Sequence, residues 1–453
     1  MIGSDIGSLI QKYDIPCPRY TSYPTVPHWK DTPSGTDWED SVRQAFDRSY
    51  SKGISLYMHL PYCEKLCTYC GCNKRITTNH GVEKPYIDSL LKEWQLYHAL
   101  FGRQPIVSEI HLGGGTPTFF SASHLQYLIE NILSTSYIPS HPEFSLEVHP
   151  NYTKKEQLQT LYHLGFRRLS VGIQDFDEKV QYIINRPQTF EQTKRVFEDA
   201  RQIGYTAINA DIIYGLPLQT IDSIRMTIDR VQELRPERIA FYSYAHVPWK
   251  SPAQRRYTET DLPQADQKRA LYELGRELLL QAGYHEIGMD HFALPADELY
   301  KAHQQGTLHR NFMGYTTQST ELLIGLGASS ISDTWNAFAQ NNKEVEAYMH
   351  EVEQGQLPIS KGHILTEEDL AVRKQILNLM CKHTTSWTGE APHYLKDALI
   401  RLKVLEDDGL VELDSHHIQV TQTGKLFIRN IAMQLDEHYW QSQSTQRTFS
   451  KAI

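Results

Sequence analysis

The sequence predicts an α/β fold: a partial, six-stranded parallel β/α barrel with an N-terminal arm and a mainly helical C-terminal domain. Two observations predict the barrel. Six short apolar segments have the character of strands, at residues 54–60, 107–113, 143–148, 168–173, 208–215 and 238–244. Amphipathic segments with helical spacing, such as 86–101 and 189–204, lie between them. Strands that alternate with helices pair in parallel, and six strands are too few for a complete eight-stranded barrel.

The two ends of the chain follow other patterns. Residues 15–29, IPCPRYTSYPTVPHW, are rich in proline, which pushes the preceding residue towards an extended backbone. We therefore expect an ordered arm rather than a helix over residues 1–45, followed by a catalytic domain over 46–330. Residues 331–453 form the third part, where segments 366–382 and 394–413 read as helices and 417–435 as a strand, a turn and a helix. This arrangement resembles a winged helix, and since the segment is not notably basic, we expect a packing or lid role.

Composition excludes several classes of function. The 453 residues are 40% hydrophobic and 22% charged, as in an ordinary globular protein, and the net charge of −9 disfavours a general nucleic-acid binder. No apolar stretch is long enough to span a membrane, and the first residues do not resemble a secretion signal. We therefore expect a cytoplasmic protein without nucleic-acid or membrane partners, whose thiols stay reduced and are available to bind metal.

Four of the six cysteines lie in one short stretch, YCEKLCTYCGCN (62–73). Cys63, Cys67 and Cys70 have the spacing C-x3-C-x2-C, and Cys72 follows after one glycine. Structural zinc normally takes two separated ligand pairs, and no second pair exists here, so an iron–sulfur cluster with one open iron fits this loop better. Thiols packed as small hydrophobic groups are the alternative, which does not explain such crowding. Cys17 and Cys381 are expected to be free.

This loop resembles the signature of the radical S-adenosylmethionine enzymes, in which three cysteines hold a 4Fe-4S cluster whose open iron binds S-adenosylmethionine. Nearly the whole chain is similar to one family among them, the oxygen-independent coproporphyrinogen III oxidases. The likeness rests on YMHLPYCEKLCTYCGCNK, HLGGGTPT, EVHPNY, VGIQDFDEKVQYIINR, ADIIYGLP, YSYAHVPW, MDHFALP, LHRNFMGYTTQ and PRYTSYPT. Related heme-chaperone proteins typically lack both Cys72 and the arm. The chain departs from the family at Tyr69 and His149, where phenylalanine and aspartate are common.

The resemblance implies a cluster held by Cys63, Cys67 and Cys70. The implied contacts of the cluster-bound S-adenosylmethionine are Tyr57, Tyr69, Gly114, Gly115, Thr116 and Glu147, and the implied catalytic residues are Tyr57, His59, Cys72 and Glu147. Some of this agrees with simple geometry, because Tyr57 and His59 alternate on one strand and Glu147 closes another. The turn GGGTPT lacks the lysine of a phosphate-binding loop, so a nucleoside triphosphate is not expected.

The resemblance also implies a second S-adenosylmethionine per chain and a substrate with four propionates. Gln174, Arg186, Asp211, Ala245 and Ile331 match the positions that line the second cofactor, although alone they would be taken for surface charges or core residues. Basic side chains are expected near the propionates. The candidates are Arg19, Lys74, Arg75 and Arg310, each of which could equally be an exposed charge.

The function that follows is the oxygen-independent oxidative decarboxylation of two propionates of coproporphyrinogen III, giving the vinyl groups of protoporphyrinogen IX. The propionate β-carbon has no acidic proton, so a radical taken from the cofactor must start the reaction. The expected enzyme is a monomer that receives electrons from a donor such as flavodoxin or ferredoxin. Two alternatives remain at this point: a heme-binding carrier with the same fold, and a zinc-stabilised module with a regulatory winged helix.

Overall fold

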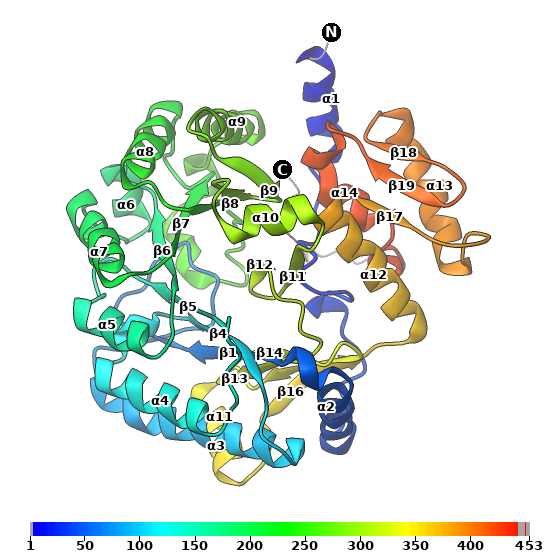
Figure 1. The fold of residues 1–453 in the computed structure, drawn as a ribbon. Coiled ribbons are helices and arrows are strands. Elements are labelled where there is room, and N and C mark those ends of the chain that lie inside the picture. Colours follow the sequence, from blue (N-terminus) through cyan, green and yellow to red (C-terminus); the bar gives the residue numbers. More distant parts are fainter. Residues whose placement is uncertain (1–2, 443–448, 450–453) are drawn as a thin grey trace.

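Twelve strands form one curved sheet in the computed structural model, which describes residues 3–442 and residue 449 (Figure 1). Seven neighbouring strands are parallel, in the order β13-β1-β4-β5-β6-β7-β8. They are β1 (Ile54–Leu60), β4 (Val107–Gly114), β5 (Glu143–Val148), β6 (Arg168–Gln174), β7 (Ala207–Tyr214), β8 (Arg238–Ser243) and β13 (Leu323–Leu326). The first six of these are the predicted strands, so the α/β class and the open parallel barrel are confirmed.

The sheet is wider than the six predicted strands. Beyond β13 it continues with β14 (Ile331–Asp333), β15 (Ala337–Asn341) and β16 (Ile359–Ile364), and beyond β8 with β10 (His291–Ala293) and β9 (His285–Gly288). These added strands are antiparallel to their neighbours and most are only three to five residues long, which is why no strand pattern stood out. The predicted domain boundary at residue 331 therefore falls inside the sheet, and the C-terminal domain begins after β16.

The outer face of the parallel strands is apolar and covered by helices (Figure 1). These helices are α3 (Glu83–Phe101), α4 (Ala122–Ser134), α5 (Lys155–His163), α6 (Glu178–Ile183), α7 (Phe190–Ile203), α8 (Ile221–Leu234) and α9 (Ala265–Gln281). Ile110, Val171 and Phe241 point outwards into this core and are fully buried, each contributing about 1.5–3 kcal/mol. Because strand side chains alternate, the residues between them face inwards, and these are polar.

For the N-terminal arm, the sequence analysis predicted an extended segment without helices. The arm instead contains two helices. Helix α1 (Gly3–Tyr13) and helix α2 (Gly35–Ser49) flank an irregular stretch over residues 14–34. Helix α2 begins at Ser34, whose hydroxyl accepts from the Asp37 N–H at 3.2 Å in a capping box. Trp38 and Phe46 then pack into the core of the large sheet. The proline-rich motif concealed the helical spacing of these apolar residues.

The irregular stretch of the arm is built into the C-terminal domain. Cys17, Tyr20 and Tyr23 are buried in the core of that domain. The Tyr20 hydroxyl donates to Asp436 Oδ2 at 3.0 Å, and Arg429 Nε donates to the carbonyl oxygen of Pro18 at 3.1 Å. The arm therefore ties the end of the chain to its beginning.

The C-terminal domain has the element order of a winged helix. Its elements are α12 (Glu367–Lys382), β17 (Thr384–Ser386), α13 (His393–Asp407), β18 (Val411–Leu413), β19 (His417–Val420), α14 (Ile428–Met433) and α15 (Glu437–Gln441), and its strands pair in the order β17-β19-β18. Shorter or peripheral elements complete the fold: β2 (Tyr62–Cys63), β3 (Arg75–Ile76), α10 (Glu298–Gln305), β11 (His309–Asn311) and β12 (Gly314–Thr316), with α11 (Val345–Glu353) lying against α3.

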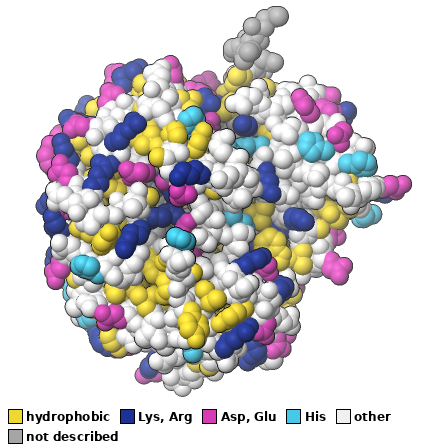
Figure 2. Space-filling model, viewed as in Figure 1, with side chains coloured by type: hydrophobic (Ala, Val, Ile, Leu, Met, Phe, Trp, Pro, Cys, Tyr) yellow, Lys and Arg dark blue, Asp and Glu magenta, His cyan; other side chains and the backbone are white. Residues whose placement is uncertain are grey.

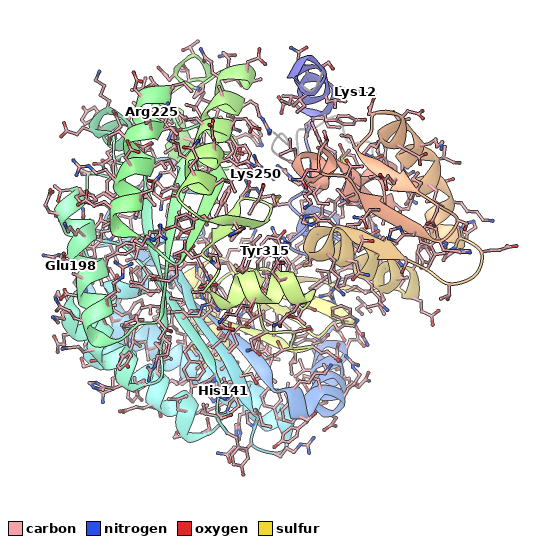
Figure 3. The ribbon with its side chains drawn as sticks, turned by 45° about the horizontal axis from the view of Figure 1, so that its top comes forward. Lys12, His141, Glu198, Arg225, Lys250 and Tyr315 are labelled. Carbon is pink, nitrogen blue, oxygen red and sulfur yellow. The ribbon has the colours of Figure 1, made fainter. Side chains whose placement is uncertain are left out.

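Among the described residues, no helix is both long and apolar enough to cross a bilayer. On the face shown in Figure 2, hydrophobic side chains form small separate patches, and side chains of both charges are mixed. Figure 3 places Tyr315 between the large sheet and the C-terminal domain, where its hydroxyl donates to the carbonyl oxygen of Met380 at 2.9 Å.

Candidate active site

A cavity of about 370 Å³ lies on the concave, polar face of the parallel strands. The cysteine loop borders it, and the inward-facing side chains of β4, β5, β6 and β7 line its length. Its polar lining includes Glu109, His111, Ser145, Glu147, Ser170, Asn209 and Asp211. Ligand sites of parallel β/α folds gather on this side of the sheet. The cavity is therefore the candidate active site.

The cysteine loop follows β1 and is fixed on several sides. All four of its cysteines line the cavity as free thiols. Cys63 Sγ lies 3.3 Å from Thr116 Oγ1, and Cys67 Sγ accepts from Arg186 Nη1 at 3.5 Å. Lys74 Nζ donates to the carbonyl oxygens of Cys70 and Cys72 at 3.1 and 3.3 Å, so this predicted substrate contact, which also lines the cavity, holds the loop.

These donors suit an iron–sulfur cluster better than a single metal ion. In the described part of the chain, the only His, Cys, Asp or Glu group with all ligand atoms within 4.8 Å of one another lies elsewhere, so the loop sulfurs do not converge on one point. A cubane needs such separation, because each cysteine binds a different iron. The cations Arg186 and Lys74 beside the loop offset the negative charge of thiolates.

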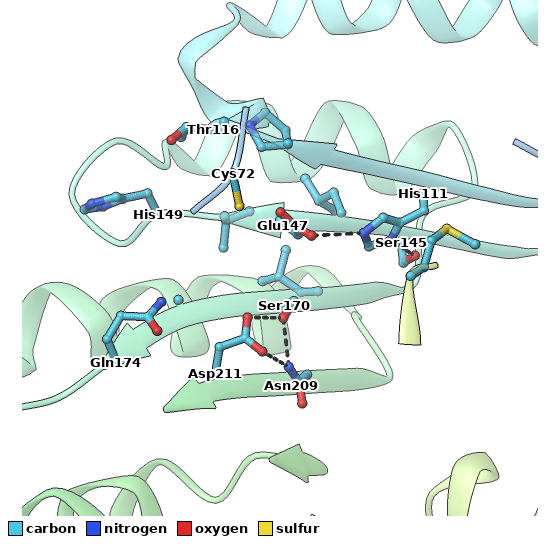
Figure 4. A pocket seen from close by; sticks show the side chains of 18 of the residues that line it. Cys72, His111, Thr116, Ser145, Glu147, His149, Ser170, Gln174, Asn209 and Asp211 are labelled. Atoms are coloured by element: carbon cyan, nitrogen blue, oxygen red, sulfur yellow. Dashed lines mark hydrogen bonds and ion pairs between the residues drawn. The ribbon is translucent and has the colours of Figure 1, made fainter. Parts of the chain in front are cut away.

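Cys70 and Cys72 differ in their protonation. A hydrogen bond from the Cys72 thiol lowers the pKa of Cys70 to about 6, whereas the same contact, together with the charge of Cys70, raises the pKa of Cys72 well above its usual value. The contact therefore favours a single thiolate within this pair. Figure 4 shows the Cys72 sulfur pointing into the cavity near Glu147.

The glycine turn owes its composition to the loop packed against it. Gly114 has a φ of +112°, which favours glycine, and a Cβ there would lie 2.7 Å from the His59 ring. A Cβ on Gly115 would lie 2.6 Å from the backbone of Pro61. Both glycines and Thr116 line the cavity, as the resemblance implied, and Thr116 N–H donates to the Tyr62 carbonyl oxygen at 3.0 Å.

Glu147 and His111 form the centre of the cavity floor (Figure 4). His111 Nδ1 lies 2.8 Å from Ser145 Oγ and its Nε2 lies 3.3 Å from Glu147 Oε1. The Glu147 side chain is 45% exposed and, among the described residues, pairs with no lysine or arginine, so its carboxylate can accept from a ligand. Sequence analysis predicted Glu147 and missed His111.

Tyr57 and His59 lie beside the cavity rather than in its lining. The Tyr57 ring stacks on His111 at 5.9 Å, and its hydroxyl lies 3.1 Å from His59 Nδ1. His59 Nε2 lies 2.9 Å from the carbonyl oxygen of Asn73, just past Cys72. Burial lowers the pKa of His59, so the neutral ring anchors the cysteine loop instead of acting as an acid. The contact with Asn73 gives His59 a positioning role, and its predicted catalytic role stays a prediction.

A second group of polar residues lies on β6 and β7. Asp211 Oδ2 accepts from Ser170 Oγ at 2.6 Å, and Asp211 Oδ1 accepts from Asn209 Nδ2 at 2.7 Å (Figure 4). Burial raises the pKa of Asp211 to about 6, and the charge of Glu147 adds to this. Gln174 ends β6 with a φ of +68°, a strained conformation of the kind that clusters at binding sites.

Arg186 connects this group to the cysteine loop. Its Nη2 donates to the carbonyl oxygen of Gly172 at 2.6 Å, and its Nε is buried without a partner among the described residues. A Cβ on Gly172 would lie 2.8 Å from Nη2, so the glycine makes room for the guanidinium. An unpaired donor of a buried cation beside a cavity fits an anionic ligand group.

Ala245, Ile331 and Arg75 are also outside the lining of the cavity. Ala245 and Ile331 were expected beside the second cofactor. The Ala245 carbonyl oxygen accepts from Gln254 Nε2 at 3.3 Å, and Ile331, on β14, packs against the cluster of Trp29 and Phe338. Arg75 is exposed and pairs with Glu346 at 2.7 Å outside the cavity.

Arg19 and Arg310 lie together at the rim of the cavity. Arg19 Nη1 donates to Asp290 Oδ2, and Arg310 Nη2 donates to the Arg19 carbonyl oxygen at 3.4 Å. The Arg310 guanidinium lies 4.6 Å from the centre of the Tyr315 ring, which lines the cavity. Arg310 is only 5% exposed, and its Nε and Nη1 have no partner in the described part of the chain. Neither arginine lines the cavity itself.

Other lining residues were missed in the sequence. The cluster-side wall includes Lys65, His149 and Tyr152, and the wall towards the C-terminal domain includes Tyr242, His291, Met313 and Tyr315. Ser145 and Asn209, two positions before Glu147 and Asp211 on the same strands, could have been found from the alternation of side chains. The lining residues of the later loops follow no periodic pattern.

Comparison with known proteins identifies the relatives of the chain. Residues 57–231 match the model of the Radical SAM superfamily. Oxygen-independent coproporphyrinogen III oxidases of Salmonella typhimurium and Pseudomonas aeruginosa are 40% and 38% identical to the chain, in each case over 98% of the chain and 98% of the relative. The solved structure of coproporphyrinogen III oxidase from Escherichia coli, a radical SAM enzyme, superposes with a TM-score of 0.89 at 38% identity and covers 95% of this chain and 98% of that one.

Proposed function

Because the chain belongs to the family of oxygen-independent coproporphyrinogen III oxidases, we propose that it converts coproporphyrinogen III to protoporphyrinogen IX by oxidative decarboxylation of two propionate side chains. It is a radical SAM enzyme that uses a 4Fe-4S cluster and S-adenosylmethionine. The observation that carries the proposal is the convergence of the cysteine loop, the Cys72 thiol and the accessible Glu147 carboxylate on one cavity.

The residues of this chain hold and orient the reacting groups. Cys63, Cys67 and Cys70 would hold the cluster, and the Thr116 turn and Glu147 would hold S-adenosylmethionine beside it. When bound, these groups supply an electron and a carbon radical able to take a hydrogen atom from an unactivated carbon. The protein fixes the propionate chain near that radical and keeps water out.

Cys72 and the rim arginines act on the substrate in this proposal. The Cys72 thiol lines the cavity, where it would lie beside the reacting carbon. The unpartnered nitrogens of Arg310 receive a substrate propionate, with Arg19 of the arm beside it. An arginine can bind a carboxylate through two hydrogen bonds at once, which also sets the orientation of the macrocycle.

The remaining parts of the proposal concern other partners. A second S-adenosylmethionine is supported by the Asp211 group, the strained Gln174 and the unpaired Arg186 Nε, which form a polar patch next to the cluster loop. We further propose a monomer that takes electrons from a flavodoxin or ferredoxin in the cytoplasm, where the cysteines outside the cluster stay reduced. The C-terminal domain then packs the arm and binds no nucleic acid.

An anaerobic assay tests the function directly. Protein with a reconstituted cluster is given S-adenosylmethionine, a reductant and coproporphyrinogen III, and the product is oxidised and measured as protoporphyrin. Product formation that requires both the cluster and S-adenosylmethionine is expected. Tight heme binding without product would instead favour the heme-carrier alternative, which the named relatives do not support.

A further inference from the structure

Two histidines and an aspartate meet far from the active site, where three segments of the chain come together. His363 lies on β16, Asp369 lies in the first turn of α12, and His438 lies on α15. Their ligand atoms all lie within 4.8 Å of one another. His438 Nε2 is 2.7 Å from Asp369 Oδ1, and His363 Nε2 is 3.6 Å from Asp369 Oδ2.

His363 has an unused nitrogen aimed into this group. The residue is 2% exposed, and its Nε2 is buried without a hydrogen-bond partner among the described residues. A buried polar nitrogen without a partner costs about 1–3 kcal/mol, unless something absent from the polypeptide satisfies it. A third imidazole ring lies close by: His28 of the arm stacks on His438, with 6.4 Å between the ring centres.

We propose that His363, Asp369 and His438 bind a divalent ion of the zinc class. Zinc takes imidazole and carboxylate ligands at about 2.0–2.1 Å in tetrahedral geometry, which places the ligand atoms about 3.3 Å apart. The His363–Asp369 separation already fits, and the His438–Asp369 contact has to widen only slightly. Three protein ligands leave the fourth position for water. The ion can enter past His438, whose side chain is 22% exposed.

The ligands are in suitable protonation states or reach them by one proton shift. Burial works against ionisation of Asp369, but the neighbouring rings of His363 and His438 hold its pKa well below the usual range, so a carboxylate is present. The Lys30 N–H approaches His363 Nδ1 at 3.4 Å, which leaves the ring proton on Nε2. On metal binding that proton moves to Nδ1, which gives up the 3.4 Å contact from Lys30 and lies 4.0 Å from the carboxylate of Asp31.

The ion would join parts of the protein that the backbone keeps separate. β16 is the edge strand of the large sheet, α12 opens the C-terminal domain, and α15 lies near the end of the chain. Tyr23 and His28 of the arm both contact the His438 ring, at 5.8 and 6.4 Å. Fixing His438 therefore fixes the arm that carries Arg19. The role is structural, and it is independent of the chemistry in the cavity.

Zinc content and zinc coordination test the proposal on the full-length protein with its cluster in place. The wild type, His363→Gln and His438→Gln are equilibrated with Zn²⁺ and a competing chelator, and zinc and iron per chain are measured. His416→Gln, at an exposed histidine of the same domain, is the matched control. Zinc-edge X-ray absorption then identifies the ligand atoms, and thermal unfolding is followed with and without Zn²⁺.

The wild type and His416→Gln should retain one zinc per chain with only nitrogen and oxygen ligands, and Zn²⁺ should raise their unfolding midpoints. Loss of one ligand should weaken binding at least about 100-fold in the other two variants, since even outer partners of metal ligands are worth 10–100-fold. Sulfur ligands would place the zinc in the cysteine loop and overturn the proposal. So would equal zinc retention in His438→Gln and wild type, or no zinc in the wild type.

Discussion

Replacing Arg310 by methionine should lower kcat/KM for coproporphyrinogen III about a hundredfold without destabilising the protein. The reason lies in the state of the guanidinium before substrate binds. Arg310 is 5% exposed, and two of its nitrogens have no partner among the described residues, so the protein holds a buried cation that is only partly satisfied. An incompletely paired buried cation lowers the stability of the unliganded protein. Binding of an anion removes this cost, which strengthens the binding.

The magnitude follows from the two unpaired nitrogens. Each hydrogen bond to a charged group is worth about 1.5–3 kcal/mol, so a carboxylate bound through both nitrogens loses about 3 kcal/mol in the variant, taking the low end for each. At 25 °C this corresponds to about a hundredfold in kcat/KM. In the free protein the substitution removes a 3.4 Å hydrogen bond to the Arg19 backbone and the stacking of the guanidinium on the Tyr315 ring. Removal of the buried charge roughly offsets both of these weak interactions, so the free energy of unfolding should change by less than about 1 kcal/mol.

The assay measures anaerobic protoporphyrinogen formation over a range of substrate concentrations, alongside iron content and thermal unfolding. Arg75→Met is the control, because Arg75 is exposed and paired with Glu346 outside the cavity, and it should behave as wild type. Normal kcat/KM in Arg310→Met would show that no propionate reaches Arg310. A large loss of stability would show that the arginine is structural, and the reasoning from its unpaired nitrogens would then fail.

The remaining predictions concern the cluster and the second cofactor. Cys67→Ala should lose iron and activity together, whereas Cys72→Ala should keep its iron and sulfide and lose much of its activity; loss of iron in Cys72→Ala would contradict the three-ligand assignment. Arg186→Lys cannot reproduce a two-point contact with a carboxylate. In equilibrium dialysis this variant should therefore bind one S-adenosylmethionine per chain instead of two, with the iron content per chain unchanged. A ratio of one in the wild type would refute this prediction. Since burial raises the pKa of Asp211 to about 6 from its usual 3.8, the folded state binds this proton more tightly than the unfolded state, and stability falls as pH rises through this interval. The unfolding midpoint of the wild type, measured relative to that of Asp211→Asn, should therefore be lower at pH 7 than at pH 5. A higher relative midpoint at pH 7 would contradict the burial argument.

The parallel strands could be predicted because they are apolar enough to be seen as separate segments. In a strand such as β4, Ile110 and Leu112 face the helices while Glu109 and His111 face the cavity. The same alternation, read one step further, would have predicted His111 as a site residue. From the motif HLGGGTPT, only the glycines and Thr116 were predicted as site residues. The glycines in fact serve the packing of the cysteine loop, as the close approach of Gly115 to Pro61 indicates.

What could not be predicted depends on interactions between distant parts of the chain. Strand β14 has only three residues, and its pairing with β13 and β15 is a tertiary interaction with no local pattern. Arg310 is distinguished from other arginines only because two of its nitrogens lack partners in the described part of the chain, which depends on its burial. His363, Asp369 and His438 are likewise spread over three elements. The spacing of residues along the sequence does not show which distant residues come into contact.

The burial of the arm in the C-terminal domain affects how the protein is made in the cell. Tyr13 and Asn430, which share a hydrogen bond of 3.0 Å, are 417 positions apart. At a synthesis rate of about 5–20 residues per second, the arm leaves the ribosome roughly 20–80 s before its partners. Leu9, Ile10 and Tyr13 remain exposed during that interval, since their final core does not yet exist. A chain that ends before the last domain therefore lacks the core in which these first residues are buried.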